Sequence, residues 1–199
     1  MIQTYERPGY TIEFDGEAHR YIVNGILTPS VSELLKHRFD DYVGVPAAVL
    51  EAAAERGTAM HAAIERYEKN GEESDLQEFR NYLFLKKHFK VENIDNEFPV
   101  AYFEDGLPIF AGTIDQVCRI DGILSINDFK RVSAPNKEKI ALQVNLYRLA
   151  YMQTYGKEID KLSFMQLRDD VRKLVNLPVN ETATKNFLKE VLENVEKRT

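Results

Sequence analysis

Alternation of apolar and polar positions predicts strands in two parts of the chain. In YTIEFDGEAHRYIVNG, residues 10–25, aromatic and β-branched residues alternate with polar ones around Asp15-Gly16, and an Asn-Gly pair closes the stretch. This pattern is typical of a hairpin. Residues 96–130 predict three antiparallel strands, with Asp-Gly turns at 105–106 and 121–122.

Helical spacing of apolar residues follows the N-terminal hairpin. Pro46 opens a helical region that reaches Gly71, and Gly57 is expected to interrupt it because glycine is a weak helix former. Thr58 is suited to cap the second segment, TAMHAAIERYEKNG. The region is therefore predicted as two helices.

Two capping boxes mark further helix starts. Ser30 with Glu33, and Ser74 with Gln77, have the spacing at which two side chains satisfy the first backbone N–H groups of a helix. The second box precedes DLQEFRNYLFLKKHF. Three further elements are predicted: a helix over 137–155, one or two strands over 161–179 and an amphipathic helix over 181–198.

The order of these elements indicates an α/β (α+β) fold around a central mixed sheet. A chain of 199 residues, 44% of them hydrophobic, is most simply one domain with one core. We divide this single domain into an N-terminal hairpin and helix (1–45), a helical region (46–90) and a sheet with flanking helices (91–199).

Composition excludes several classes of protein. The longest apolar stretch, around VPAAVL, is too short to cross a bilayer, and the first ten residues lack the basic-then-apolar layout of a signal peptide. Cys118 is the only cysteine, which excludes an internal disulfide and an all-cysteine metal cluster. We therefore expect a cytoplasmic protein that makes no contact with a membrane.

The charge of the chain gives a mixed indication. A net charge of −6 counts against a protein that coats nucleic acid. Basic residues nevertheless group at 85–90 and at 129–139, where a solvated surface and a basic groove are equally good explanations. Because local placement of charge steers a ligand, an enzyme with a basic groove stays open.

Two acids interrupt the predicted strands at opposed positions. A two-residue turn at Asp121-Gly122 pairs the residues beside it, and counting outward along both strands pairs Asp115 with Asp128. Carboxylates opposed in this way lie about 5 Å apart and repel each other. Lys130 shares a face with Asp128 because side chains alternate along a strand. Such a group suits a divalent cation and phosphodiester hydrolysis, whereas the simpler reading is a solvent-facing Asp pair beside a surface lysine.

Two predicted helices carry further candidates. His61 follows a Gly-Thr pair in RGTAMHAAIERY, although a helical histidine more often belongs to the core or the surface than to a metal site. Gln143 and Tyr147 are four residues apart, on one side of the helix over 137–155. A glutamine within an apolar stripe needs a hydrogen-bond partner, but ordinary helix packing is favoured on spacing alone.

In chain order, Gly-Thr-x-x-His, Ile-Asp, Asp-x-Lys and Gln-x-x-x-Tyr resemble the motifs of the RecB-like branch of the PD-(D/E)XK nuclease superfamily. Phage and prophage exonucleases of that branch are the closest fit, because their N-terminal region is similar to HRYIVNGILTPSVSELL. The resemblance spans residues 10–155. It implies a restriction-endonuclease-like fold and metal-dependent hydrolysis of DNA.

The resemblance also implies roles for single residues. Asp115, Asp128 and Lys130 would be catalytic, the last as the catalytic lysine. The metal, Mg²⁺ or Mn²⁺, would be held by His61, Asp115, Asp128 and the backbone carbonyl of Phe129. Gln143 and Tyr147 would contact the substrate near the scissile phosphate, and Glu97 would be an additional acid.

The position of Glu97 depends on the loop before it. A three-residue loop at 105–107 would pair Glu97 with Asp115, whereas a loop of two or four residues would not. The chain also departs from the superfamily: Ile114 replaces the motif proline, and one cysteine cannot bind the iron–sulfur cluster that several RecB-like members carry. No helicase phosphate loop is present, which predicts a stand-alone nuclease domain.

We therefore expect a metal-dependent deoxyribonuclease, most simply an exonuclease of phage-type recombination or DNA processing. A structure-specific endonuclease would share the active site and differ in the channel around it. A non-catalytic nucleic-acid-binding protein on a decayed nuclease fold is a third alternative, although decay normally removes an acid or the lysine. DNA is the expected partner, and analogy adds a single-strand-binding or recombination protein. Digestion polarity, strand preference and oligomeric state stay open.

Overall fold

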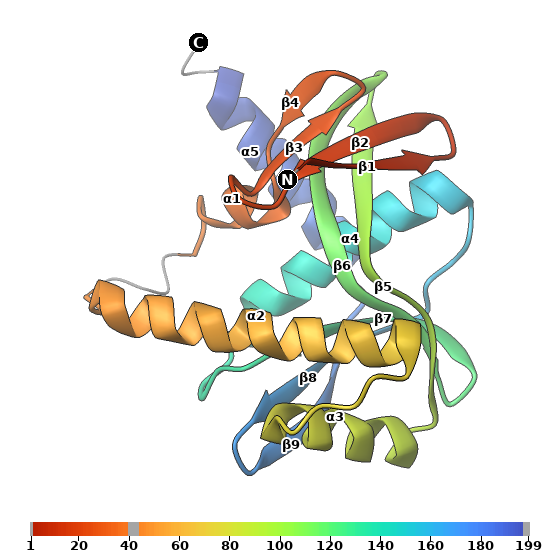
Figure 1. The fold of residues 1–199 in the computed structure, drawn as a ribbon. Coiled ribbons are helices and arrows are strands. Elements are labelled where there is room, and N and C mark those ends of the chain that lie inside the picture. The colour runs from red at the N-terminus through yellow and green to blue at the C-terminus, as the bar shows by residue number, and fades with distance from the viewer. Residues whose placement is uncertain (1, 40–43, 197–199) are drawn as a thin grey trace.

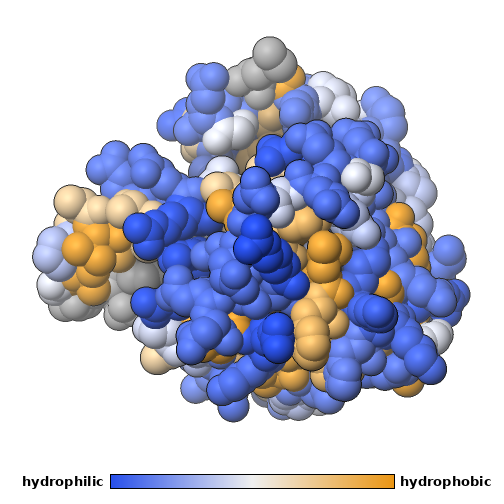
Figure 2. All heavy atoms as spheres, turned by 60° about the horizontal axis from the view of Figure 1, so that its bottom comes forward, coloured by the Kyte–Doolittle hydropathy of each residue, from blue (hydrophilic) through white to orange (hydrophobic). Residues whose placement is uncertain are grey.

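The structure is a computed structural model that describes residues 2–39 and 44–196. It is a mixed α/β protein with two sheets (Figure 1). None of the helices in this described part is long and apolar enough to cross a membrane. Figure 2 brings the lower end of Figure 1 forward and shows a mostly hydrophilic surface, with a narrow hydrophobic strip near the middle and a second hydrophobic group at the left edge.

The smaller sheet is N-terminal, antiparallel and four-stranded: β1 (Ile2–Arg7), β2 (Tyr10–Asp15), β3 (Arg20–Val23) and β4 (Ile26–Thr28), in that order. The predicted hairpin is confirmed, because β2 pairs with β3 and the Asn-Gly pair turns the chain into β4. β1 adds a strand that the sequence pattern does not predict, since most of its residues are exposed.

The larger sheet has the strand order β5-β6-β7-β8-β9: β5 (Val91–Glu104), β6 (Leu107–Ile120), β7 (Ile123–Lys130), β8 (Lys161–Arg168) and β9 (Val171–Leu177). Only β7 and β8 are parallel, so the sheet is mixed, as predicted. The three predicted strands and both Asp-Gly turns are confirmed, and the stretch 161–179 forms two strands.

Five helices occur in the described chain: α1 (Val31–Leu35), α2 (Ala47–Asn70), α3 (Gln77–His88), α4 (Lys137–Tyr155) and α5 (Glu181–Glu196). The Ser30–Glu33 capping box before α1 is confirmed. α4 matches its predicted range, with Asn136 as its N-terminal cap. Residues 197–198 of the predicted last helix lie outside the described part.

Helices cover both faces of the larger sheet. Val117 packs in a cluster with α1, α4 and α5, whereas its neighbour Cys118 packs in a second cluster with α2 and α3. Because successive side chains of a strand point to opposite faces, these two clusters lie on opposite sides of the sheet. The smaller sheet packs against Ala101 and Ala111 of β5 and β6 through a third cluster.

Two helix predictions are wrong. α2 runs unbroken through Gly57, and Thr58 caps nothing, because the flanking alanines favour the helix enough to absorb a glycine that costs about 1 kcal/mol. α3 begins at Gln77 with Leu76 as its cap residue. The Ser74 hydroxyl accepts the N–H of Leu76 at 3.3 Å instead, a local bond that competes with helix capping.

Candidate metal centre

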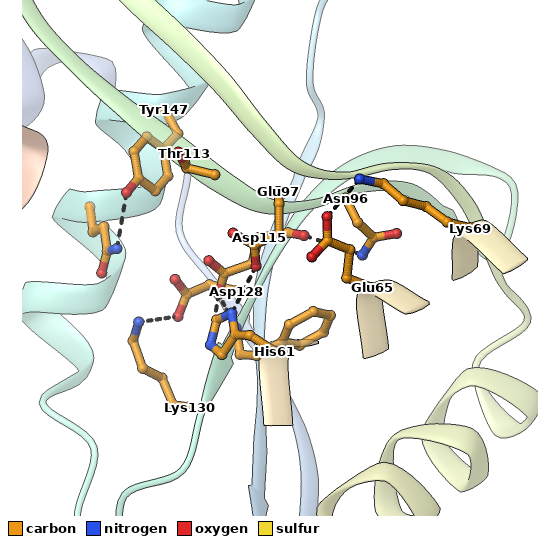
Figure 3. A network of polar contacts seen from close by, with 12 residues as sticks. His61, Glu65, Lys69, Asn96, Glu97, Thr113, Asp115, Asp128, Lys130 and Tyr147 are labelled. Atoms are coloured by element: carbon orange, nitrogen blue, oxygen red, sulfur yellow. Dashed lines mark hydrogen bonds and ion pairs between the residues drawn. The ribbon is translucent and has the colours of Figure 1, made fainter. Parts of the chain in front are cut away.

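The β6–β7 ladder has the predicted register. Its pairs run without a shift from the Asp121-Gly122 turn to Gln116 and Asn127. Both turn residues have positive φ, as a tight hairpin turn requires. Asp115 and Asp128 are the next residues on their strands, so the two acids lie side by side where the ladder ends (Figure 3).

The side chain of Asp115 closes this end of the ladder. Its Oδ2 accepts the backbone N–H of Phe129 at 2.7 Å. In a hydrogen-bonded antiparallel pair each residue directs its N–H and its C=O toward the same neighbouring strand. The carbonyl of Phe129 therefore faces the β6 side, toward Asp115, which agrees with its expected role as a ligand without testing it.

Glu97 lies opposite Asp115, but by a different route from the predicted one. The turn between β5 and β6 has two residues, Asp105-Gly106, and not three. A register shift beside Tyr102 and Phe103 supplies the extra residue, so the pairs on either side of Glu97 fall where a three-residue loop would have put them. The expectation that a two-residue loop would separate Glu97 from Asp115 is wrong because it did not allow for a β-bulge.

Glu97 has an unusual backbone. Its φ is 48°, in the left-handed region, which costs a non-glycine residue roughly 1–2 kcal/mol. The side-chain amide of Asn96 donates to the carbonyl of Asp115 at 3.2 Å beside it. Strain of this kind persists where surrounding contacts fix it, and it concentrates at functional sites.

His61 comes to these acids from α2. Met60, one residue before it, and Ile64, three residues after it, are buried under the helix, which turns the half-buried imidazole toward the sheet. Its Nδ1 is 3.0 Å from Glu97 Oε1, and its Nε2 is 3.8 Å from Asp115 Oδ2. The ring also meets the edge of Phe129, with centroids 5.7 Å apart. Each nitrogen of the imidazole is therefore close to one carboxylate.

The electrostatics of His61 follow from this position. Burial lowers the pKa of the imidazole, but the Asp115 charge and the hydrogen bond with Glu97 outweigh burial and raise the pKa to about 9. The protein as described thus favours a positive charge between these acids.

Asp128 is the most deeply buried acid of the group, with 1% of its surface exposed. Burial raises the pKa of its carboxyl to about 7; Lys130 lowers it and Asp115 adds to the rise. Lys130 Nζ is 2.7 Å from Asp128 Oδ2, so the two residues share a face, as predicted. Among the described residues, neither carboxylate oxygen has a hydrogen bond of good geometry.

Gln143 and Tyr147 form a pair on α4. The Gln143 amide donates to the Tyr147 hydroxyl at 3.3 Å, and Tyr147 is buried against β6. A Cβ on Gly112 would lie 2.7 Å from the Tyr147 ring, so this close approach requires glycine. Burial is the main cause of a raised pKa of Tyr147, and the charges of Asp115 and Asp128 add to the rise. Substrate contact by these two residues stays a prediction.

Sequence reasoning missed a row of buried polar side chains beneath the site. The Gln116 amide donates to the Tyr82 hydroxyl at 2.9 Å, and Asn127 donates to Gln116 Oε1 at 3.2 Å. Ser163 donates to Asn127 at 2.9 Å and completes a row across three strands. Polar residues within the apolar stretches TIDQVCRI and ILSINDF were the available signal. The row holds the strand positions next to both acids.

These residues fit a divalent cation. Ligand atoms of His61, Glu97 and Asp115 all lie within 4.8 Å of one another. Asp128 adds a buried carboxylate whose oxygens lack good hydrogen bonds, next to Asp115. Lys130 faces the Asp128 carboxylate from β7. Several negative charges grouped in a buried place are costly, and a bound cation would offset that cost. The carboxylates and one imidazole suit Mg²⁺ or Mn²⁺.

Comparisons with other proteins add little. No protein-family model matches the chain, and no curated protein matches it. Among solved structures, that of SSO0001 aligns with 83% of this chain and 75% of its own, at 15% identity and a TM-score of 0.45. A likeness this distant carries no argument about function, so the function has to be argued from the geometry of the site.

Proposed function

We propose that the protein is a metal-dependent deoxyribonuclease of the RecB-like PD-(D/E)XK type, most simply an exonuclease. The observation that carries this proposal is the grouping of His61, Glu97 and Asp115, whose ligand atoms lie within 4.8 Å of one another, with the Asp128–Lys130 ion pair beside them. These side chains come from one helix and three strands, so their meeting is a product of the fold.

The arrangement of strands supports the same proposal. β7 and β8 are parallel and joined through α4, and the acids lie toward the carboxyl end of β7. In sheets with such crossovers, ligands commonly bind outside the carboxyl ends of the strands. The four sequence motifs, with Gln143 and Tyr147 on the joining helix, fall around this end. A restriction-endonuclease-like fold is part of the proposal.

The cation would be held by His61 Nε2, Asp115, Asp128 and the Phe129 carbonyl. Glu97 occupies Nδ1 of the imidazole at 3.0 Å, which leaves Nε2 facing Asp115. This is the arrangement in which a carboxylate orients a histidine ligand. When bound, Mg²⁺ or Mn²⁺ polarises the phosphate and lowers the pKa of an attacking water. Imidazole tilts the choice toward Mn²⁺, and Mg²⁺ is the proposed physiological ion.

Lys130 contributes a charge that needs no metal. Its ammonium is held at 2.7 Å from Asp128 and is one quarter exposed, so it can reach both the buried acid and a ligand. Three N–H donors allow it to orient a water molecule and to donate to phosphate oxygens. Placed in advance, such a donor stabilises negative charge that develops on those oxygens.

The experiment that tests the proposal compares end-labelled linear duplex, linear single strand and closed-circular DNA, each with Mg²⁺, Mn²⁺ or EDTA. Loss of linear DNA alone, dependent on metal, is the expected result and also gives the strand preference. Cutting of the circle would replace the exonuclease by a structure-specific endonuclease. DNA binding without cleavage under every condition would replace both by a binding protein on a nuclease fold.

A further inference from the structure

Lys139 lies on the stripe of α4 that carries Gln143 and Tyr147. Lys139 precedes Gln143 by four residues, as Gln143 precedes Tyr147. Residues four apart lie one above the other on the same side of a helix. Lys139 is half-buried, Gln143 is half-buried and Tyr147 is buried, so the stripe runs from the interior toward the surface.

The first turn of α4 is fixed relative to the catalytic strands. Gln166 pairs in register with Lys130 across β7 and β8. Its side-chain amide donates to the carbonyls of Val132 and Ser133 at 2.7 and 3.1 Å, which holds the segment between Lys130 and α4. Asn136 then caps the helix by accepting the N–H of Lys139 at 3.1 Å. These hydrogen bonds therefore hold the backbone at Lys139 in place relative to the catalytic strands.

Tyr147, at the inner end of the stripe, lies on the same side of the site as Lys130. In Figure 3, Tyr147 and Lys130 lie to the same side of Asp115 and Asp128, away from Glu65. The Tyr147 hydroxyl points along α4 to Gln143, in the direction of Lys139. A DNA strand that is bound at the acids and leaves the site on this side would pass Gln143 and then Lys139.

We propose that Lys139 binds a backbone phosphate of the DNA strand and extends the site along α4. The inference rests on the proposed function and names a substrate contact that the family motifs do not include. Eight residues of helix place Lys139 roughly 12 Å from Tyr147 along the axis. That length corresponds to roughly three nucleotides of a B-form strand at about 3.4 Å each.

Lys137 provides a matched control. It lies two residues before Lys139, in the same first turn, but about 200° around the helix at 100° per residue. It is exposed, and both lysines carry the same charge at the same end of the same helix. Lys137→Ala and Lys139→Ala therefore change net charge and helix electrostatics alike and differ in the face that they alter.

The test measures binding of a fluorescent oligonucleotide by anisotropy in EDTA, over a range of salt, and cleavage with Mn²⁺. Lys139→Ala should raise Kd roughly fivefold and reduce the salt slope by about one, as expected for the loss of one phosphate contact. In the cleavage assay, Lys139→Ala should raise KM and leave kcat unchanged. Lys139→Arg should restore binding, and Lys137→Ala should match wild type.

The two claims fail in different ways. If wild type cleaves DNA but the two alanine variants behave alike, the phosphate contact is wrong and the nuclease stands. If wild type neither binds nor cleaves any DNA, the proposed function and the contact fall together. Thermal melting of each variant verifies that a loss of binding does not come from unfolding.

Discussion

Glu97 Oε1 lies 3.0 Å from Nδ1 of His61, and Asp115 Oδ2 lies 3.8 Å from Nε2 of the same ring. The contact joins a strained strand residue to a helix residue 36 positions away in sequence. It fixes the orientation of the ring and directs Nε2 toward the other acids. Glu97 is therefore best understood as a residue that positions a ligand.

Glu97→Gln tests this relationship with little change of shape. The glutamine can still accept a hydrogen bond from Nδ1 but no longer supplies a charge. Loss of an outer carboxylate of this kind weakens metal affinity about 10–100-fold, and we expect a loss in that range for Mn²⁺ by titration calorimetry. An unchanged Mn²⁺ affinity would mean that the charge of Glu97 does not serve the metal site.

The two opposed aspartates should differ in their effect on the metal-free protein. Asp128 carries the buried charge, whereas Asp115 accepts the Phe129 N–H and lies near His61. Because Asp128 has a folded-state pKa of about 7, above its ordinary value, its contribution to stability is present at low pH and is lost as the pH rises through 7.

Asp128→Asn should therefore melt higher than wild type in EDTA at pH 8, and the difference should shrink toward pH 5. Asp115→Asn is the control and should bring no such gain, because the Asp115 carboxylate is less buried than that of Asp128 and accepts the Phe129 N–H. Differential scanning fluorimetry across this pH range is the measurement. A higher melting temperature for Asp115→Asn alone would show that the costly buried charge resides on Asp115 and not on Asp128.

Substitution by alanine should have opposite effects on stability at two glycines. Gly112→Ala places a Cβ 2.7 Å from the Tyr147 ring and should destabilise the protein by about 1–3 kcal/mol, a typical cost of overpacking. Gly57→Ala meets nothing within 4 Å inside α2 and should stabilise by about 0.5–1 kcal/mol. Urea unfolding gives both values. Equal midpoints for the two variants would refute the close packing of α4 on β6.

Cys118 should be inert in the folded protein. It is buried, and burial raises the pKa of its thiol to about 12, so the reactive thiolate is scarce at neutral pH. A chromogenic disulfide reagent should react with one thiol in urea and with almost none in buffer. Rapid reaction of the native protein would show that the helices on that face open readily.

The opposed acids could be predicted because an Asp-Gly turn fixes the register of both strands around it. The register shift that brings Glu97 opposite Asp115 could not be predicted, since a β-bulge leaves no mark in the sequence pattern of IFAGT or VAYFE. The break expected at Gly57 failed for a related reason: the low helix propensity of one glycine is outweighed by the alanine, glutamate and arginine residues that flank it on both sides.

The partners of the site were harder to predict than its acids. The meeting of His61 with Glu97 depends on how α2 packs on the sheet, which local pattern does not specify. The row formed by Tyr82, Gln116, Asn127 and Ser163 likewise becomes visible only when three strands and a helix are assembled. Single polar residues in apolar strands pointed to these positions without naming their partners.

The most direct test of the account separates metal binding from catalysis in Lys130→Ala. Mn²⁺ binding by calorimetry and cleavage of labelled linear DNA are measured at pH 8 on wild type, Lys130→Ala and Asp115→Asn. We predict that Lys130→Ala binds Mn²⁺ and loses at least about a hundredfold in cleavage, consistent with removal of a preorganised donor, whereas Asp115→Asn loses both. Cleavage by Lys130→Ala at the wild-type rate would contradict the account, because this lysine would then have no part in the chemistry.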